Sequence, residues 1–282
     1  MKVLVTGGAG RLGYCVSKQL VEKGHSVRVF DLPQVEWSHV EALGADVFRG
    51  DITDLGSVAG ACYNVDAVVH LAALLPPRSE SSRELTMKVN VHGTENILKS
   101  ISRDTPIVLT SSISTYGVTA QAQPPLKETS LQTAHNNYSE SKINSEKLVR
   151  VTGNPTSILR IAPISVADLV ELPDVIPYRG DQRVEFVFVD DAATAIVSSL
   201  EVCDDREVYN IAGGRSWQMT GGEYIDRFYA ALGVEVEPVF SDDYTAVDWY
   251  DTKKGTSLGY QRTSFNQLER KLEVLGEELG LR

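Results

Sequence analysis

Apolar and polar residues alternate along the first half of the chain in a pattern of short strands and amphipathic helices. Two stretches, residues 11–23 and 85–102, carry apolar residues at helical spacing. Around them lie short runs rich in β-branched residues, which read "KVLVT", "SVRVF", "DVFRG", "DAVVHLA" and "PIVLTSS". Near-continuous apolar strands separated by helices predict a parallel sheet that is covered on both faces, in a doubly wound α/β fold.

The second half keeps this alternation but is less regular. We predict helices over residues 137–151 and 191–202, a third beginning near residue 220, and a tail helix over residues 265–280. The predicted strands are "TSILRIA", "VEFVFV" and "EVYNIAG", and residues 163–183 and 239–254 are expected to be irregular. No linker divides the chain, so residues 1–282 are expected to form a single unit.

Composition narrows the class of protein. The chain has 27 Lys and Arg against 38 Asp and Glu, a formal net charge of −11, and no basic run, so we expect no nucleic-acid partner. It has no long apolar run and no recognisable leader at "MKVLVTGG", so we expect no membrane contact and a cytoplasmic location. The three cysteines lie far apart, with no pair at metal or redox spacing.

A glycine-rich turn follows the first predicted strand and opens the first helix. In "TGGAGRLG", Gly7, Gly10 and Gly13 recur every third residue, and Arg11 and Leu12 fall at the start of the helix. Glycine allows close approach of the backbone, and a helix N-terminus offers N–H groups and a positive dipole end to an anion. This turn therefore predicts a pyrophosphate site formed by these five residues.

The second strand ends in a carboxylate, in "SVRVFD", 18 residues after Gly13. Asp31 at that place can accept hydrogen bonds from the ribose hydroxyls of an adenosine and would repel a 2′-phosphate. The next residues, Leu32 and Pro33, supply no arginine for such a phosphate. We therefore predict NAD rather than NADP as the cofactor, with Asp31 and Leu32 beside the adenosine ribose.

With these elements in order, the chain resembles the extended short-chain dehydrogenase/reductase group, the NAD-dependent epimerase/dehydratase family. The resemblance rests on the glycine turn and on "GDITD", "HLAA", "VNVHGTENIL", "LTSSISTYG", "YSESK", "LRIAP" and "FVFVDDAATAI". It implies a Rossmann fold over mainly residues 1–162, and a small substrate-binding region with returning core elements over mainly residues 163–282. It also implies cofactor contacts from Asp51, Ile52, Leu71, Ala72, Ala73, Asn90, Ser111, Ile161 and Ala162.

"YSESK" places Tyr138 and Lys142 four residues apart, on one face of a helix. A tyrosine phenol titrates near pH ~10, and a nearby ammonium and an oxidised nicotinamide would lower that value and allow the phenol to exchange a proton with a substrate hydroxyl. The resemblance selects Ser112 rather than Ser111 as the serine that orients the substrate oxygen. Both Tyr138 and Lys142 would also contact the cofactor.

The same spacing occurs twice more, and these pairs are expected to carry no chemistry. Tyr14 and Lys18 follow the glycine turn, on a helix that packs on the sheet. Tyr250 and Lys254 fall in "DWYDTKKG", which we interpret as a solvated loop. His70 is expected to end a buried strand without chemistry.

Two acidic residues, Asp190 and Asp191, are expected to cap a helix rather than bind metal, because no further carboxylate or histidine clusters with them. We therefore predict no metal site.

The expected reaction is hydride transfer at a secondary alcohol of a small polar, possibly sugar-like molecule. Members of the family that act on nucleotide sugars carry an asparagine where this chain has Pro163 and a longer segment than residues 163–184, so a nucleotide-sized substrate is disfavoured. Arg78, Arg179 and Arg183 could hold a substrate anion or could be surface charges.

Two alternatives remain open: a nucleotide-sugar epimerase or dehydratase, and a non-catalytic regulator that senses NAD. The regulator is disfavoured because such proteins commonly lose the tyrosine or the lysine, and this chain keeps both. By analogy with the family we expect a homodimer through the helices at residues 85–102 and 138–151.

Overall fold

The core of the protein is one parallel sheet of seven strands. The computed structural model describes residues 1–168 and 172–282. The strands lie in the order β10-β6-β5-β4-β1-β2-β3, and every pair is parallel. They are β1 (Lys2–Thr6), β2 (Ser26–Asp31), β3 (Asp46–Arg49), β4 (Ala67–His70), β5 (Ile107–Ser112), β6 (Thr156–Ile161) and β10 (Val208–Ile211). The predicted doubly wound α/β fold is confirmed.

The central strands β1 and β4 are buried along almost their whole length because both faces of the sheet are covered. In β1, Val3 and Val5 belong to one buried cluster and Leu4 belongs to another. Successive side chains of a strand point to opposite faces, so these two clusters are the two layers of core on either side of the sheet. Full burial of each such side chain contributes about 1.5–3 kcal/mol.

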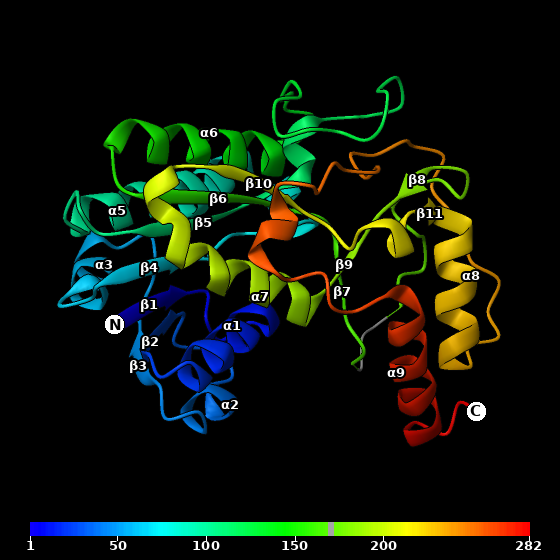
Figure 1. Cartoon of the computed structure of the whole chain (residues 1–282), viewed down its shortest axis with the longest axis horizontal. Helices are drawn as coiled ribbons and strands as arrows, with labels where there is room; N and C mark the ends of the chain where they lie inside the picture. Colours follow the sequence, from blue (N-terminus) through cyan, green and yellow to red (C-terminus); the bar gives the residue numbers. More distant parts are fainter. Residues whose placement is uncertain (169–171) are drawn as a thin grey trace.

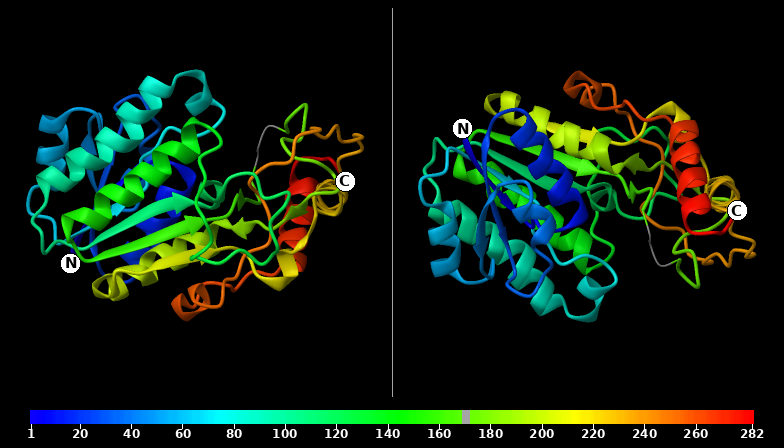
Figure 2. Two further views of the ribbon diagram at one scale, coloured as in Figure 1. Left: turned by 90° about the horizontal axis from the view of Figure 1, so that it is seen from above. Right: turned by 90° about the horizontal axis from the view of Figure 1, so that it is seen from below.

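Helices cover both faces, as the two views in Figure 2 show. On one face α1 (Arg11–Glu22) packs beside α7 (Val189–Ser199), with the short α2 (Ser38–Glu41) next to α1. The other face carries α3, α5 and α6 (Figure 1). Their bounds, with those of α4 and the π-helical turn that precede α5, are α3 (Leu55–Cys62), α4 (Arg83–Thr86), the π turn (Met87–His92), α5 (Gly93–Ser100) and α6 (Asn137–Thr152).

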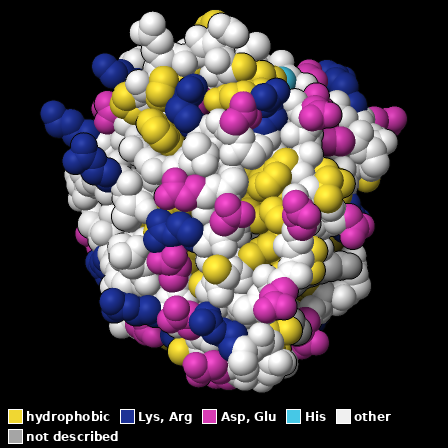
Figure 3. All heavy atoms as spheres, turned by 90° about the vertical axis from the view of Figure 1, so that its right-hand side faces the viewer, with side chains coloured by type: hydrophobic (Ala, Val, Ile, Leu, Met, Phe, Trp, Pro, Cys, Tyr) yellow, Lys and Arg dark blue, Asp and Glu magenta, His cyan; other side chains and the backbone are white. Residues whose placement is uncertain are grey.

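The C-terminal part adds a smaller lobe at the right of Figure 1, beyond the carboxyl ends of the sheet strands. Its core packs α8 (Gly221–Leu232) against α9 (Phe265–Glu278). Two small sheets join it to the rest: β7 (Ile164–Ser165) with β9 (Val187–Phe188), and β8 (Arg183–Val184) with β11 (Met219–Thr220). On its outer face hydrophobic side chains gather in groups between charged side chains of both signs (Figure 3).

The prediction of one strand at "VEFVFV" is wrong. The run divides into β8 and β9, and its last valine, Val189, already begins α7. The division occurs at Glu185, whose buried carboxylate accepts hydrogen bonds from the backbone N–H groups of Gly214 (2.8 Å) and Tyr250 (3.0 Å). The segment thus pairs first with β11, then binds backbone N–H groups through Glu185, and then pairs with β7. A local apolar pattern does not reveal these long-range partners.

Short 3-10 helices complete the described chain: η1 (Arg78–Ser81), η3 (Ile113–Tyr116), η4 (Leu200–Asp205), η5 (Arg215–Trp217) and η6 (Gly255–Leu258). The segment predicted as irregular, residues 163–183, holds β7 and the start of β8, and its residues 169–171 lie outside the described residues. Within the described ranges, no helix combines the length and apolarity needed to cross a membrane.

Candidate active site

The glycine turn lies between β1 and α1, where the strand order reverses at the carboxyl edge of the sheet. Gly7 has a φ of +67°, and a Cβ there would lie 2.9 Å from the backbone nitrogen of Ala72. A Cβ on Gly13 would collide with the Gly7 carbonyl oxygen. Packing within the protein therefore requires glycine at both positions.

Gly10 is different, because nothing in the protein requires a glycine there. It has an ordinary φ of −73°, and an added Cβ would approach only the Gly7 carbonyl oxygen, at 3.5 Å. Gly10 is also the N-cap of α1 and provides no side-chain cap. The missing side chain keeps the surface above the helix N-terminus open, which is what close approach of a pyrophosphate needs. The turn therefore fits a dinucleotide.

Asp31 stands at the end of β2, beside this turn. Its two carboxylate oxygens accept hydrogen bonds from the backbone N–H groups of Ala9 (3.1 Å) and Leu32 (2.8 Å). Each carboxylate oxygen has a second lone pair, so Asp31 can still accept from ribose hydroxyls. The carboxylate thus shapes the glycine turn as well as facing the position predicted for the ribose.

The end of β4 is fixed by buried hydroxyl and imidazole groups. The Thr6 hydroxyl oxygen accepts from the N–H groups of Leu71 and Ala72, both at 3.2 Å, and contacts Nδ1 of His70 at 2.7 Å. Nε2 of His70 contacts the Thr94 hydroxyl at 3.0 Å. Burial, with the charge of Lys142, lowers the pKa of His70 to about 3. A neutral, fully bonded imidazole agrees with the structural role predicted for His70.

Asn90, predicted to support the ribose near the nicotinamide, uses its amide within the protein. Its Oδ1 accepts from Leu74 N–H at 2.6 Å, and its Nδ2 donates to the Leu74 carbonyl (3.1 Å) and the Ser141 hydroxyl (2.8 Å). Asn90 therefore ties the loop after β4 to α6. A cofactor contact from this side chain stays a prediction.

The remaining predicted cofactor residues lie at the same carboxyl edge of the sheet. Ile52 is buried and contacts α5 at Gly93, while Asp51 is exposed and accepts from Thr53 N–H at 2.8 Å. Ile161 ends β6 and Ala162 follows it, both buried. Three more residues were predicted to contact the cofactor. The exposed side chain of Arg11 pairs with Asp168 at 3.3 Å, Leu12 is half-buried, and Ala73 follows β4.

Tyr138 lies in the first turn of α6, facing the end of β5. Asn136 begins the helix with a capping box, and the Glu80 carboxylate accepts from the N–H groups of Asn137 (2.9 Å) and Tyr138 (3.2 Å). Acidic groups at a helix N-terminus stabilise it, so both contacts fix where the phenol points. The phenol lies beside the hydroxyl of Ser112, the last residue of β5.

Lys142 lies one turn further along α6 and is buried. Its Nζ donates to the Thr110 carbonyl at 2.9 Å and lies 5.6 Å from the centre of the Tyr138 ring. The structure thus brings together Ser112, Tyr138 and Lys142, the three residues predicted to be catalytic. Ser111 points elsewhere, because its hydroxyl donates to Glu146 at 2.6 Å, as expected for neighbouring residues of a strand.

The acidity of the phenol differs from what we predicted. Burial raises the pKa of Tyr138 to about 12, and the neighbouring Ser112 hydroxyl lowers it only in part. Burial also lowers the pKa of Lys142 to about 8, against the opposing charge of Glu146. In the protein alone the phenol is therefore protonated at neutral pH, the state that donates a proton to a carbonyl oxygen. Proton removal from an alcohol depends on the added positive charge of an oxidised nicotinamide.

A buried ion pair behind the lysine was not predicted from the sequence. Glu146 accepts from Nε and Nη2 of Arg160 at 2.9 and 2.8 Å, and both side chains are at most 3% exposed. Arg160 also donates to the Tyr116 phenol at 3.1 Å. Glu146 follows Lys142 by four residues on the same helix face, so the helical spacing could have suggested it. Its arginine partner, on β6, has no such local signal.

The other two Tyr/Lys pairs lie outside this arrangement. The Tyr14 ring packs edge-on against His39, at 5.3 Å between centres. The interpretation of Tyr250 as part of a solvated loop is wrong. Its side chain is 2% exposed, and its phenol donates to the Ala246 carbonyl at 3.0 Å and accepts from Asp248 N–H. A segment without helical periodicity can still be buried when long-range contacts cover it.

The arginines considered as anion ligands are in part already paired. Arg179 makes two hydrogen bonds to Asp181, at 2.7 and 2.8 Å. Arg183 makes two to the buried Asp248, at 2.7 and 2.9 Å. Arg78 lies exposed on η1.

The expectation that Asp190 and Asp191 cap a helix is wrong in detail, because both lie inside the first turn of α7. Asp191 instead accepts from the N–H groups of Arg262 (3.1 Å) and Thr263 (2.8 Å), and so holds the segment that precedes α9. Within residues 1–168 and 172–282, no group of three or more His, Cys, Asp or Glu side chains is arranged so that it could hold a metal ion.

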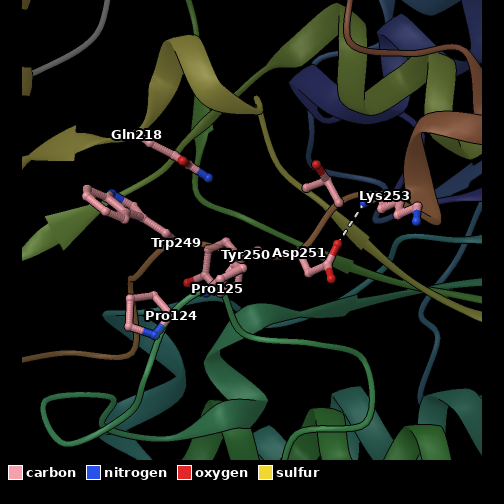
Figure 4. Close-up of a pocket in the computed structure, with 8 residues that line it drawn as sticks. Pro124, Pro125, Gln218, Trp249, Tyr250, Asp251 and Lys253 are labelled. Atoms are coloured by element: carbon pink, nitrogen blue, oxygen red, sulfur yellow. Dashed lines mark hydrogen bonds between the residues drawn. The ribbon is translucent and has the colours of Figure 1, made fainter.

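Two cavities adjoin the loop between β5 and α6. One, of about 510 Å³, lies between Pro124 and Pro125 of this loop and the segment that carries Trp249 and Lys253 (Figure 4). The other, of about 360 Å³, is bounded by Tyr116 and by residues 118–133 of the same loop. The hydrogen bonds of Leu126 with the backbone of residues 249 and 251 hold the two walls together.

Residues 3–162 match the sequence profile of the NAD dependent epimerase/dehydratase family. The chain belongs to this family. The prediction of the family is thus confirmed, and NAD is the cofactor. The matched region ends at Ala162, at the close of β6, and so contains the glycine turn, Asp31 and the Ser112, Tyr138 and Lys142 group.

Members and structural neighbours of the family differ in what their names describe. A 3 beta-hydroxysteroid dehydrogenase/Delta 5-->4-isomerase of Mycobacterium tuberculosis is 39% identical over 103 residues, 34% of this chain and 27% of that protein. The human short-chain dehydrogenase/reductase family 42E member 1 is 28% identical over 257 residues, 80% of this chain and 64% of that protein. The matches therefore span less than two thirds of the length of these relatives.

Among solved structures, a UDP-glucose-4-epimerase from Stenotrophomonas maltophila, with bound NAD and formylated UDP-arabinopyranose, superposes with a TM-score of 0.84. It shares 24% sequence identity, and the match covers 99% of both chains. At this identity the likeness establishes the fold.

Proposed function

We propose that the protein is an NAD-dependent oxidoreductase that interconverts a secondary alcohol and its ketone. The observation that carries this proposal is the convergence of the Ser112 hydroxyl, the Tyr138 phenol and the Lys142 ammonium at the carboxyl end of β5. Bound NAD would supply the hydride acceptor at this edge of the sheet. The chain itself supplies the proton transfer and the orientation of the substrate oxygen.

The roles of the three residues follow from their contacts. The Ser112 hydroxyl lies beside the phenol, so the two groups can share one substrate oxygen. Tyr138 exchanges the proton of that oxygen, while the carbon loses or gains hydride. Lys142, held by the Thr110 carbonyl, keeps a positive charge beside the phenol and favours its ionised form.

The test is the variant Tyr138→Phe, which removes only the phenol oxygen. General acid–base catalysis contributes about 10²–10⁴-fold to rate, so kcat should fall by at least about 100-fold, with NAD affinity nearly unchanged. Tyr63→Phe is a matched control, because Tyr63 is 69% exposed at the end of α3. Retention of most activity in Tyr138→Phe would remove the acid–base assignment.

The alternative of a nucleotide-sugar epimerase or dehydratase keeps the same three residues but returns the hydride to the substrate. It draws support from the family name and from structural neighbours that are epimerases. The pairing of Arg179 with Asp181 and of Arg183 with Asp248 speaks against it, since a diphosphate needs cations to hold it. Lasting accumulation of NADH with an alcohol would favour the oxidoreductase; conversion of a nucleotide sugar without it would favour the epimerase.

An NAD-sensing regulator would bind the cofactor without turnover of any substrate, so the same assays separate it from both enzymes.

We further propose that the chain folds as a single unit and is located in the cytoplasm. Supporting the location, Cys15, Cys62 and Cys203 are free thiols, which suits a reducing compartment. A small polar, sugar-like substrate remains compatible with the catalytic group, which by itself recognises only the reacting alcohol.

A further inference from the structure

The loop that joins β5 to α6 forms the smaller cavity described above. Its lining combines apolar side chains, from Val118, Ala122, Leu126 and Leu131, with hydroxyl- and amide-bearing side chains such as those of Thr119 and Gln123. Every described residue that lines it is uncharged. A volume of about 360 Å³ falls at the lower end of the range for small-molecule sites, which suits a compact ligand better than a nucleotide sugar.

Both ends of this loop are anchored at the catalytic group. The loop leaves Ser112 through η3, and the Tyr116 at the end of η3 already lines the cavity. Four residues of 3-10 helix rise by about 8 Å. At the other end, Thr133 donates its N–H to the Thr115 carbonyl at 2.9 Å, five residues before Tyr138. The part of the cavity wall at Tyr116 therefore lies about 8 Å along the chain from Ser112, a distance that one small substrate molecule can span.

Buried polar atoms without hydrogen-bond partners concentrate around the same loop. Across the described part of the chain there are six such side-chain atoms, and three belong to Ser114, Thr119 and Gln132. A fourth, the phenol oxygen of Tyr244, lies beside the Thr119 hydroxyl, yet neither oxygen makes a hydrogen bond of good geometry. Each buried polar atom without a partner costs about 1–3 kcal/mol, and Thr119 is the one of these four residues that lines the cavity, where a ligand hydroxyl or carbonyl could offset that cost.

Two arginines beside the cavity are each bound to a carboxylate. Arg183 reaches the Ala122 carbonyl at 3.5 Å, but its guanidinium is bound to the buried carboxylate of Asp248 through two hydrogen bonds. Arg160, beneath Tyr116, is bound to Glu146. Neither guanidinium is therefore free to pair with a phosphate or carboxylate placed in this cavity, and burying an unpaired anion is costly.

We propose that this cavity binds the part of the substrate beyond the reacting alcohol, and that this part is uncharged, with an apolar body and a hydroxyl or carbonyl group. The inference rests on the proposed oxidoreductase function and adds the class of substrate to it. An uncharged substrate would distinguish this protein from an enzyme that binds a nucleotide sugar or a carboxylic acid.

The first experiment follows NADH absorbance with two matched pairs of substrates: cyclohexanol against hydroxycyclohexanecarboxylate, and methyl glucoside against methyl glucuronide. We expect kcat/KM to be at least about tenfold higher for the uncharged member of a pair, which corresponds to about 1.4 kcal/mol. Higher kcat/KM for the charged members would overturn the inference and leave the oxidoreductase function standing. No hydride transfer to any of the four, with NAD bound, would refute the function itself.

The second experiment adds a charge at the rim of the cavity. Val118→Asp changes a 55% exposed residue, so the fold should tolerate it, and KM for the uncharged substrate should rise at least about tenfold with little change in kcat. Val236→Asp is the matched control. Val236 is 65% exposed and lies on a loop of the smaller lobe, so this change should leave KM unchanged. An unchanged KM in Val118→Asp would place the substrate elsewhere.

Discussion

Replacing Glu146 with glutamine tests how far the buried ion pair supports the site. The change keeps the shape of the side chain but removes the charge that faces Arg160, which is 3% exposed and bound at 2.8 and 2.9 Å. Breaking a buried pair by neutralising one partner costs about 3–5 kcal/mol, because the other charge stays buried and uncompensated. We expect Glu146→Gln to lose about that much of the free energy of unfolding.

The matched control is Glu95→Gln on α5. Glu95 pairs with Lys99 at a similar distance, 2.8 Å, but both side chains are largely exposed, at 42% and 55%. Exposed helical pairs of this spacing contribute about 0.3–0.5 kcal/mol. The two variants therefore remove one carboxylate each from ion pairs of equal length and differ in burial.

The assay is urea unfolding followed by circular dichroism. With a slope of about 3 kcal/mol/M, a loss of about 3 kcal/mol lowers the midpoint by about 1 M, whereas the control should shift by about 0.1–0.2 M. A second readout is the pH profile of turnover. The charge of Glu146 raises the pKa of Lys142, which burial holds at about 8, so its removal should move the titration of Lys142 to lower pH. Equal midpoints for the two variants would refute the argument from burial.

Asp31→Ala should weaken NAD binding and raise the ratio of NADP to NAD affinity, because it removes the carboxylate that also holds Ala9 N–H; an unchanged ratio by titration calorimetry would contradict this. Burial raises the pKa of Glu185 to about 7 from its ordinary value near 4.5, so the folded state binds an extra proton between those values. Stability should therefore rise as pH falls from about 7 to about 4.5, and Glu185→Gln should abolish this part of the pH dependence in thermal unfolding; an identical pH profile would disprove it. Finally, we predict a homodimer through α4, α5 and α6, where Leu85 and Val151 are 45% and 80% exposed, and a monomer mass by light scattering would refute it.

Elements that depend on neighbouring residues were predictable from the sequence. The order of strands and helices follows from apolar periodicity, which local residues set. The glycine turn and Asp31 are read from spacing because one strand and one helix place them. Tyr138 and Lys142 share a helix face whatever surrounds that helix.

The sequence by itself thus determined the fold class, the family and the side chains available for proton transfer. The tertiary structure decided how these groups behave: the direction of Ser111 toward Glu146, the pairing of Glu146 with Arg160, and the use of the Asn90 amide within the protein. It also set the pKa of Tyr138 at about 12, because loss of water around a phenol depends on segments that are distant in sequence and close in space. Burial and long-range pairing are properties of the packed chain, and no local pattern contains them.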